Sequence, residues 1–132
     1  MPLLATKIST AASDNFRVLK GKFVSSADGD GDYIAFELPK HCYIILATAE
    51  IKTAFTALST GTLTVGIKEP GAVIDASRLG ADTVTLSEVV GSKVLAAGIY
   101  LENGGVLTLG VTKGDSVANL VARAFVVYSV IH

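Results

Sequence analysis

Residues 42–67 read CYIILATAEIKTAFTALSTGTLTVGI, and this stretch decides the fold class. Apolar or small residues recur at the odd positions over 45–55 and again over 63–67, whereas polar residues such as Glu50 occupy even positions. A period of two indicates strands that are buried on one face. Because a short break with a glycine separates the two runs, the stretch predicts a pair of antiparallel strands.

Short runs rich in β-branched and aromatic residues, bounded by turn residues, recur along the rest of the chain. Asn103-Gly104 predicts a tight hairpin turn that pairs the strands on either side of it, because Asn-Gly supplies the positive φ that such turns require. Residues 72–80 suit either a short helix or an irregular loop. No stretch shows a helical period of useful length. The sequence therefore predicts an all-β fold, an antiparallel β-sandwich or jelly roll of about eight strands. The further strands are expected over residues 16–24, 33–38, 83–86, 98–101, 106–111 and 118–131.

The chain is expected to consist of an arm and one domain. Residues 1–15 are small and polar and offer no core face, so they are interpreted as an N-terminal arm that is either disordered or lies on a neighbour. Residues 16–132 are expected to form a single β-sandwich domain. A chain of 132 residues can bury about two-thirds of its unfolded surface, so it needs no metal or disulfide to fold.

The composition argues against several classes of protein. Half of the residues are apolar and 17% are charged, which argues against a disordered chain. The net charge is −1 and the basic residues are scattered, which argues against a nucleic-acid partner. No signal peptide and no segment of membrane-span length is recognised, so we expect synthesis in a cytoplasm and no membrane partner. The lone Cys42 is interpreted as a buried, inert thiol.

Apolar residues lie on both faces of the last strand and of the strand that begins at Cys42. One face of an antiparallel sheet normally meets water, so a second apolar face requires a cover. Either a loop of the same chain or a partner subunit could supply that cover. The arm is too polar to do so, and we favour a second copy of the chain in a symmetric homo-oligomer, of which a trimer is one form. The residues expected at this contact are Ile44, Leu46, Val121, Phe125, Val127 and Ile131.

The run DGDGD at residues 28–32 places carboxylates at alternate positions, as at the start of a calcium-binding loop. The rest of that pattern is missing, because Tyr33 replaces the invariant glycine and Pro39 replaces the bidentate glutamate. The first interpretation is a solvated acidic loop without a cofactor. The alternative is a calcium site made by Asp28, Asp30 and Asp32, in a calcium-dependent ligand- or carbohydrate-binding module.

No catalytic constellation is recognised in the sequence. His41 and His132 have no spacing that brings them to a common site, and neither a nucleophile elbow nor a phosphate loop is present. Glu37 and Glu50 could pair across strands, but outward carboxylates on strands usually face water. An enzyme is not expected.

Several segments together resemble small structural proteins of tailed bacteriophages, namely decoration, head-stabilising or fibre-type components with a β-sandwich or jelly-roll fold. The segments that carry the resemblance are Leu38-Pro39, IILATAEIKTAF (44–55), GTLTVG (61–66), GVLTL (105–109) and ANLVARAFVVY (118–128).

The resemblance implies a non-enzymatic virion protein, made in the host cytoplasm. Such a protein would bind a capsid or tail lattice, through the major capsid protein or other virion proteins, as a symmetric homo-oligomer.

Overall fold

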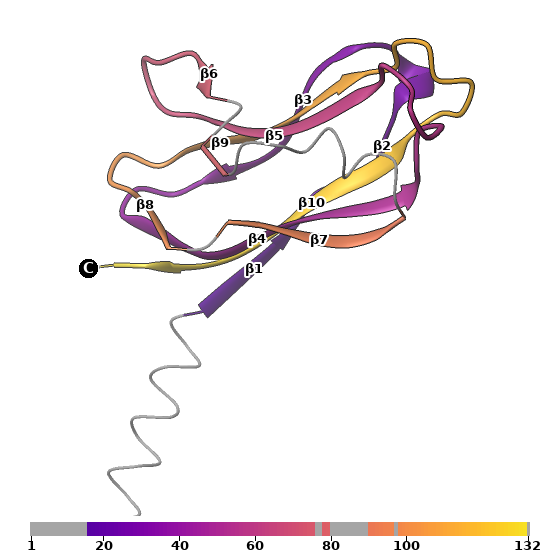
Figure 1. Cartoon of the computed structure of the whole chain (residues 1–132). Coiled ribbons are helices and arrows are strands. Elements are labelled where there is room, and N and C mark those ends of the chain that lie inside the picture. The colour runs from indigo at the N-terminus through magenta and orange to yellow at the C-terminus, as the bar shows by residue number, and fades with distance from the viewer. Residues whose placement is uncertain (1–15, 76–77, 80–89, 97, 132) are drawn as a thin grey trace, which may run out of the picture.

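The computed structural model describes residues 16–75, 78–79, 90–96 and 98–131 (Figure 1). Over these ranges the chain forms two antiparallel sheets that pack face to face, with the core between them. The predicted all-β sandwich is therefore confirmed. The arm (1–15), the strand expected at 83–86, and His132 lie outside the described residues.

The first sheet, called sheet A, has β4 (Cys42–Thr53) and β10 (Val121–Val130) at its centre. β1 (Phe16–Lys20) borders β10, and β7 (Gly91–Ala96) borders β4. Two short strands complete the sheet, since β2 (Val24–Ser25) pairs with β10 and β8 (Ile99–Leu101) pairs with β4. β7 was not predicted from the sequence.

The second sheet, called sheet B, has the order β3-β9-β5-β6. Its strands are β3 (Gly31–Leu38), β9 (Gly105–Thr112), β5 (Thr62–Lys68) and β6 (Ile74–Asp75). A single 3-10 turn, η1 (Ser26–Asp28), precedes β3. The segment expected to be a short helix or an irregular loop contains the two-residue strand β6 within its described residues 72–75.

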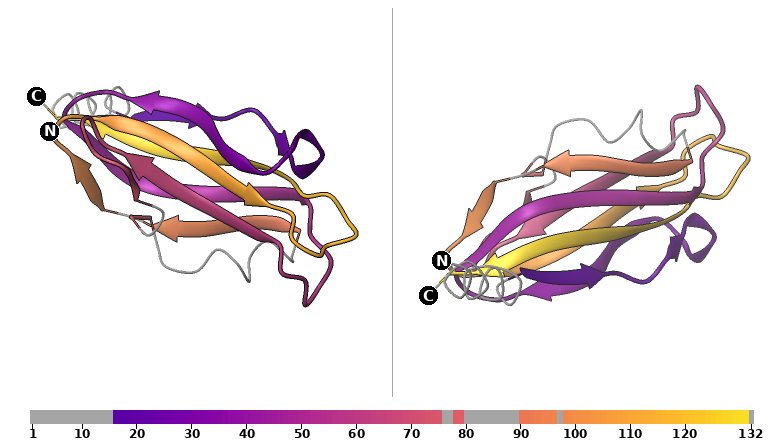
Figure 2. Two further views of the ribbon diagram at one scale, coloured as in Figure 1. Left: turned by 90° about the horizontal axis from the view of Figure 1, so that it is seen from above. Right: turned by 90° about the horizontal axis from the view of Figure 1, so that it is seen from below.

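Within the described ranges, five connections pass from one sheet to the other, namely β2–β3, β3–β4, β4–β5, β8–β9 and β9–β10 (Figure 2). Two predicted pairings are wrong for this reason: β4 and β5 belong to different sheets, and so do β8 and β9 on either side of Asn103-Gly104. Alternating residues indicate that a strand has one buried face, but they do not indicate which strand lies beside it. Two strands on opposite sides of the core alternate in the same way as two neighbours in one sheet. Residues 54–61 form an arch that buries Phe55 between the sheets, at 3% exposure.

A bulge in β4 changes which of its residues face the core. Leu46 pairs with Val127 and Ile44 pairs with Tyr128, so Ile45 is an extra residue that reverses the alternation. Ile44 is consequently fully buried, which corrects its expected position on the outer face. Cys42 is buried beside it, as predicted, and desolvation raises the pKa of its thiol to about 11.

The bulge makes a prediction for a matched pair of variants. Ile44→Ala should lower the free energy of unfolding by about 2–5 kcal/mol, because it leaves a cavity in the core. Leu46→Ala, on the outer face, should cost about 1 kcal/mol. Urea denaturation of both variants measures the difference, and equal or reversed losses would contradict the position of the bulge.

Candidate interaction surface

The outer face of sheet A is apolar across four strands. In β10 Ala124 and Val126 are buried in the core, so Phe125 and Val127 point outward. Residues directly opposite each other share a face, and the register therefore gives three outward rows. These rows are Phe16–Ser129–Tyr43–Tyr100, Val18–Val127–Leu46 and Lys20–Phe125–Thr48–Val94.

Many side chains in these rows remain accessible. Phe16 and Val18 are 52% and 55% exposed, and Val94 is 68% exposed. Isolated apolar residues on a surface are common, whereas a contiguous apolar patch marks an interaction site. The outer face of sheet A is therefore the candidate interaction surface of the described chain.

Charged side chains border this surface at one end. Arg123 Nε lies 2.6 Å from Glu50 Oε2, in a pair between β10 and β4. The Arg123 guanidinium also lies 4.6 Å from the ring centre of Phe23, and Lys52 Nζ lies 5.6 Å from the same ring. Lys20 Nζ is 5.7 Å from the ring centre of Phe125. These cation–π contacts partly shield the aromatic rings in the isolated chain.

The predicted contact residues fall into three groups. Leu46, Phe125 and Val127 lie in the rows of the outer face. Val121 lies on the same face where β10 begins, and Ile131 follows the other end of that strand at 47% exposure. Ile44 belongs to the core. Contact with a partner stays a prediction for the five accessible residues.

Further members of this surface were missed. Phe16 and Val18 alternate correctly in the sequence, and the apolar face of β1 could have indicated them. Val94 and Tyr100 could not be assigned, because β7 was not predicted and β8 reads as a weak strand.

The outer face of sheet B has a different chemistry. Thr62 pairs with Thr112, and Thr64, Gly110 and Asp32 form the next row. A side chain at Gly110 would meet Thr64 Oγ1 at 2.4 Å and Asp32 Oδ1 at 2.8 Å, so these two polar groups lean over the glycine. The two outer faces of the sandwich therefore differ: the rows on sheet A are mainly apolar, whereas these rows on sheet B carry threonine, glycine and aspartate, with the exposed Ile34 (72%) in the row beside them.

Three loops are joined by hydrogen bonds at the end of the sandwich where η1 lies (Figure 1). We call this end, residues 25–31, 54–61 and 113–120, the loop end. The Ser26 hydroxyl accepts from the Leu120 N–H at 2.9 Å, and the Ser116 hydroxyl accepts from the Thr56 N–H at 2.9 Å. Both serines are buried, and their hydroxyls connect loops that are distant in sequence through hydrogen bonds.

The carboxylates of the predicted calcium loop have separate positions. Asp28 is exposed in η1, Asp30 Oδ1 accepts from the Lys113 N–H at 2.9 Å, and Asp32 lies on the outer face of sheet B. The Tyr33 hydroxyl donates to the Gly29 carbonyl within the same loop. All of these residues are described, and no group of three His, Cys, Asp or Glu side chains in the described ranges could hold a metal ion.

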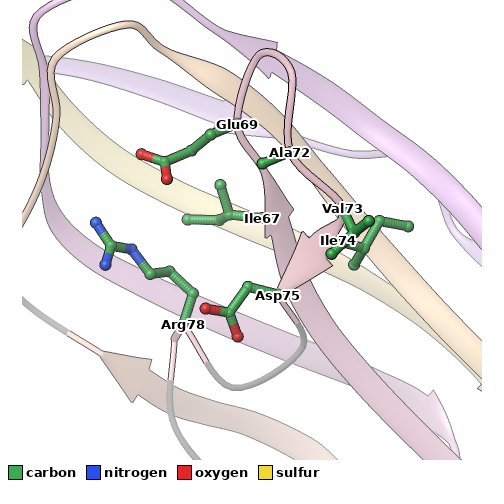
Figure 3. Close-up of a pocket in the computed structure, with 7 residues that line it drawn as sticks. All are labelled: Ile67, Glu69, Ala72, Val73, Ile74, Asp75 and Arg78. Carbon is green, nitrogen blue, oxygen red and sulfur yellow. The ribbon is translucent and has the colours of Figure 1, made fainter.

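A shallow hollow of about 550 Å³ lies beside β6, where Figure 3 shows Glu69, Asp75 and Arg78 around Ile67. Its remaining described lining is small or aliphatic, namely Ala72, Val73 and Ile74. The lining combines carboxylates with a guanidinium and provides no hydroxyl, thiol or imidazole. Glu37 and Glu50, considered above as a pair, belong to different sheets. Within the described residues, no helix is long and apolar enough to cross a membrane.

At the loop end, hydrogen bonds from Thr60 favour the charged form of the Asp115 carboxylate. The carboxylate accepts from the backbone N–H and, at 3.1 Å, from the hydroxyl of Thr60. These bonds lower the pKa of Asp115 below its ordinary value of 3.8. A carboxylate with a lowered pKa stabilises the fold above that ordinary value, and its contribution is lost as the pH falls through the folded-state pKa.

We therefore expect the wild-type chain to lose stability relative to Asp115→Asn as the pH falls below 3.8. Urea midpoints measured from pH 7 to pH 2 test this difference. Thr60→Val removes the hydroxyl that donates to Asp115, so it should reduce the pH-dependent difference in stability. Parallel pH profiles for the wild type and Asp115→Asn would contradict the prediction.

No family model and no curated protein sequence matches the chain. Among solved structures, its fold is similar to a chain of the cyanophage Pam1 capsid asymmetric unit, with a TM-score of 0.63 and 19% identity over 89% of this chain and 86% of that one. It is also similar to a chain of the acidic stable capsid of Helicobacter pylori bacteriophage KHP30 (TM-score 0.61, 16% identity, 87% of each chain). A chain of the Ralstonia phage GP4 capsid gives a TM-score of 0.59 and 16% identity over 89% and 84%. At these identities the likeness shows the fold: the chain shares its sandwich with chains of three bacteriophage capsids.

Proposed function

We propose that the chain is a non-enzymatic structural protein of a bacteriophage virion. It binds the capsid lattice as a symmetric homo-oligomer and stabilises it, after synthesis in the host cytoplasm. The partners under this proposal are other copies of the chain and the protein that forms the shell.

The main support for this proposal is that the structural alignments cover most of both chains. The three alignments span 84–87% of the capsid chains and 87–89% of this chain. Each capsid chain is therefore close to this chain in length, and the likeness concerns whole small chains rather than one domain of a large shell protein. This supports a decoration or stabilising role over the role of the shell itself. Since all three neighbours are described as capsids, a head lattice is favoured over a tail lattice.

The contrast between the two outer faces supports self-association. An oligomer buries its apolar surface and leaves its polar surface to solvent. The outer face of sheet A has the required apolar character, with Val18, Leu46, Phe125 and Val127 near its centre. We assign the contact between copies to this face.

The segment 1–15 precedes β1, which lies at the edge of sheet A. Fifteen extended residues span roughly 50 Å, whereas four strands spaced about 4.8 Å apart span roughly 15–20 Å. An arm of this length could cross the whole sheet and reach a neighbouring subunit. We assign the arm to contacts with neighbours in the particle.

The calcium-dependent binding module is the weaker candidate. Asp30 Oδ1 accepts from the Lys113 N–H, Asp32 lies on the outer face of sheet B, and within the described residues no group of three acidic, His or Cys side chains could hold a metal ion. Calorimetry with calcium discriminates the candidates: binding heat together with a rise in melting temperature would favour the module over the virion protein.

Binding to shells tests the proposed function. The purified chain should co-sediment with empty heads from its own phage that lack this protein, and it should raise their resistance to heat. Removing residues 1–14 should weaken binding about tenfold or more, because contacts with neighbours are lost, while the melting temperature of the free domain is unchanged. A wild-type chain that does not bind any head would refute the function, and unaltered binding after truncation would refute the role of the arm.

Val127→Asp should disrupt the homo-oligomer, because it places a charge at the centre of the apolar face. We expect self-association to weaken about 100-fold or more, as measured by light scattering during size-exclusion chromatography, and circular dichroism to show a folded chain. Thr64→Asp, on the outer face of sheet B, is the matched control and should associate like the wild type. A wild-type chain that is monomeric at high concentration would contradict the assignment.

A further inference from the structure

β1 is an edge strand of sheet A, because it pairs with β10 on one side and with no described strand on the other (Figure 2). Four of its five residues are exposed, and Leu19 is half-buried against the core. The backbone N–H and C=O groups along such an edge lack a partner strand, so they can pair with a strand of another chain. The chemistry of this edge therefore decides what can bind there.

A hydrogen bond beside β1 indicates which of its backbone groups point to the open side. The Gly21 N–H donates to the Ala124 carbonyl at 2.8 Å, one step beyond the Lys20–Phe125 pair. Opposite residues in an antiparallel ladder alternate between hydrogen-bonded and non-hydrogen-bonded pairs, and the register of β1 on β10 has no irregularity. The even-numbered residues of β1 therefore belong to the non-hydrogen-bonded pairs, and their N–H and C=O groups point away from β10.

Three residues of β1 have outward backbone groups by this argument, namely Phe16, Val18 and Lys20. The Phe16 carbonyl accepts from the Arg17 guanidinium at 3.2 Å, which agrees with this direction, and its second lone pair can accept from another donor. The side chains of the same three residues lie on the outer face of sheet A, where Phe16 and Val18 are 52% and 55% exposed. The open edge of β1 is thus also the margin of the apolar face.

We propose that β1 pairs antiparallel with β1 of a second copy, with Val18 opposite Val18 of the partner subunit. This inference rests on the self-association in the proposed function and names the strand through which two copies meet. In this register Phe16 lies opposite Lys20 of the partner subunit, and Lys20 lies opposite the partner's Phe16. The outward groups of all three residues then meet one another, which gives about six hydrogen bonds, two for each pair. The arrangement is two-fold symmetric, so the same surface serves both copies.

The side chains of β1 favour this register over its neighbours. Centring the pair on Arg17 or on Lys20 would place two like charges directly opposite each other, which is destabilising. Centring it on Leu19 would leave Phe16 without a partner in β1. With Val18 at the centre all residues of β1 pair, and Lys20 meets a phenylalanine ring of the partner subunit in a favourable cation–π contact. Charges on an edge strand deter unspecific pairing, and here they also select one register.

The edge contact is compatible with the contact assigned to the outer face of sheet A. Both outer faces come to the same side of the extended sheet, because the two-fold axis between the β1 strands is perpendicular to that sheet. The apolar row of Leu46, Val127 and Val18 then continues into the same row of the partner subunit. Further copies can bind this doubled surface, so the two contacts together build one oligomer.

A proline at the centre of β1 tests the backbone contact. The Val18 N–H points away from β10, so Val18→Pro removes no bond within the sheet, and edge strands accept proline at such positions. The full-length variant should stay folded by circular dichroism but self-associate about 30-fold more weakly, because the dimer loses two donors. Val18→Thr is the matched control, since it retains the N–H and the β-branched shape, and it should self-associate nearly as the wild type does. Size-exclusion chromatography with light scattering measures both variants.

Engineered cysteines test the register. Chains with Phe16→Cys and chains with Lys20→Cys should form disulfide-linked dimers when they are mixed and oxidised, but neither should do so alone, because position 16 lies opposite position 20. Val94→Cys is the matched control, since Val94 is 68% exposed on β7 at the other edge of sheet A, and it should link to neither variant. The native Cys42 is buried and does not contribute.

Weaker association of Val18→Pro than of Val18→Thr, with linkage confined to the mixed cysteine pair, supports the proposal. Wild-type association of Val18→Pro would overturn it, and so would equal linkage with the control; if Val18→Pro does not fold, the linkage pattern decides. A monomeric wild-type chain also overturns it, and if Val18→Pro then loses binding to empty heads, a strand of the shell protein occupies the edge instead. The proposed function fails separately, when the wild type does not bind heads whatever its oligomeric state.

Discussion

The antiparallel pairing of β4 with β10 is the interaction on which the rest of the structure depends. These two strands occupy the centre of sheet A, and every other strand of that sheet pairs with one of them. Four of their inward residues, Ala47, Ala49, Ala122 and Ala124, are small and buried, which lets the two sheets approach closely there. The chain passes repeatedly between the sheets, and sheet B packs against the inner face that β4 and β10 provide.

The same pair also determines the outer surface. The alternation that directs Ala124 and Val126 inward directs Phe125 and Val127 outward, beside Leu46 of β4. The core and the candidate interaction surface are thus the two sides of one pair of strands. On sheet B, threonine, glycine and aspartate occupy most of the outward positions, with Ile34 as an exposed apolar exception, so the sandwich has one mainly apolar flank and one mainly polar flank. Because the inward and outward side chains are different residues, the outer ones can serve binding without weakening the core.

The loop end is organised by hydrogen bonds rather than by apolar burial. Buried hydroxyls of Ser26 and Ser116 and the carboxylate of Asp115 connect loops that lie far apart in sequence. Such bonds fix a loop geometry at a modest gain in stability. They join turns that include Leu58, whose φ is +63°.

Local sequence determined that the chain is all-β, where most strands lie, and that apolar residues line two faces of the last strand, because alternation within a strand is written directly in residue order. Strand pairing was decided by tertiary structure, since strands such as β4 and β5 alternate alike whether they face each other across the core or lie side by side. The register was also decided there: one extra residue, Ile45, moves Ile44 from the surface to the core. The loop end depends on contacts such as Thr56 with Ser116, sixty residues apart, and no local pattern encodes a contact that forms only after both sheets have packed.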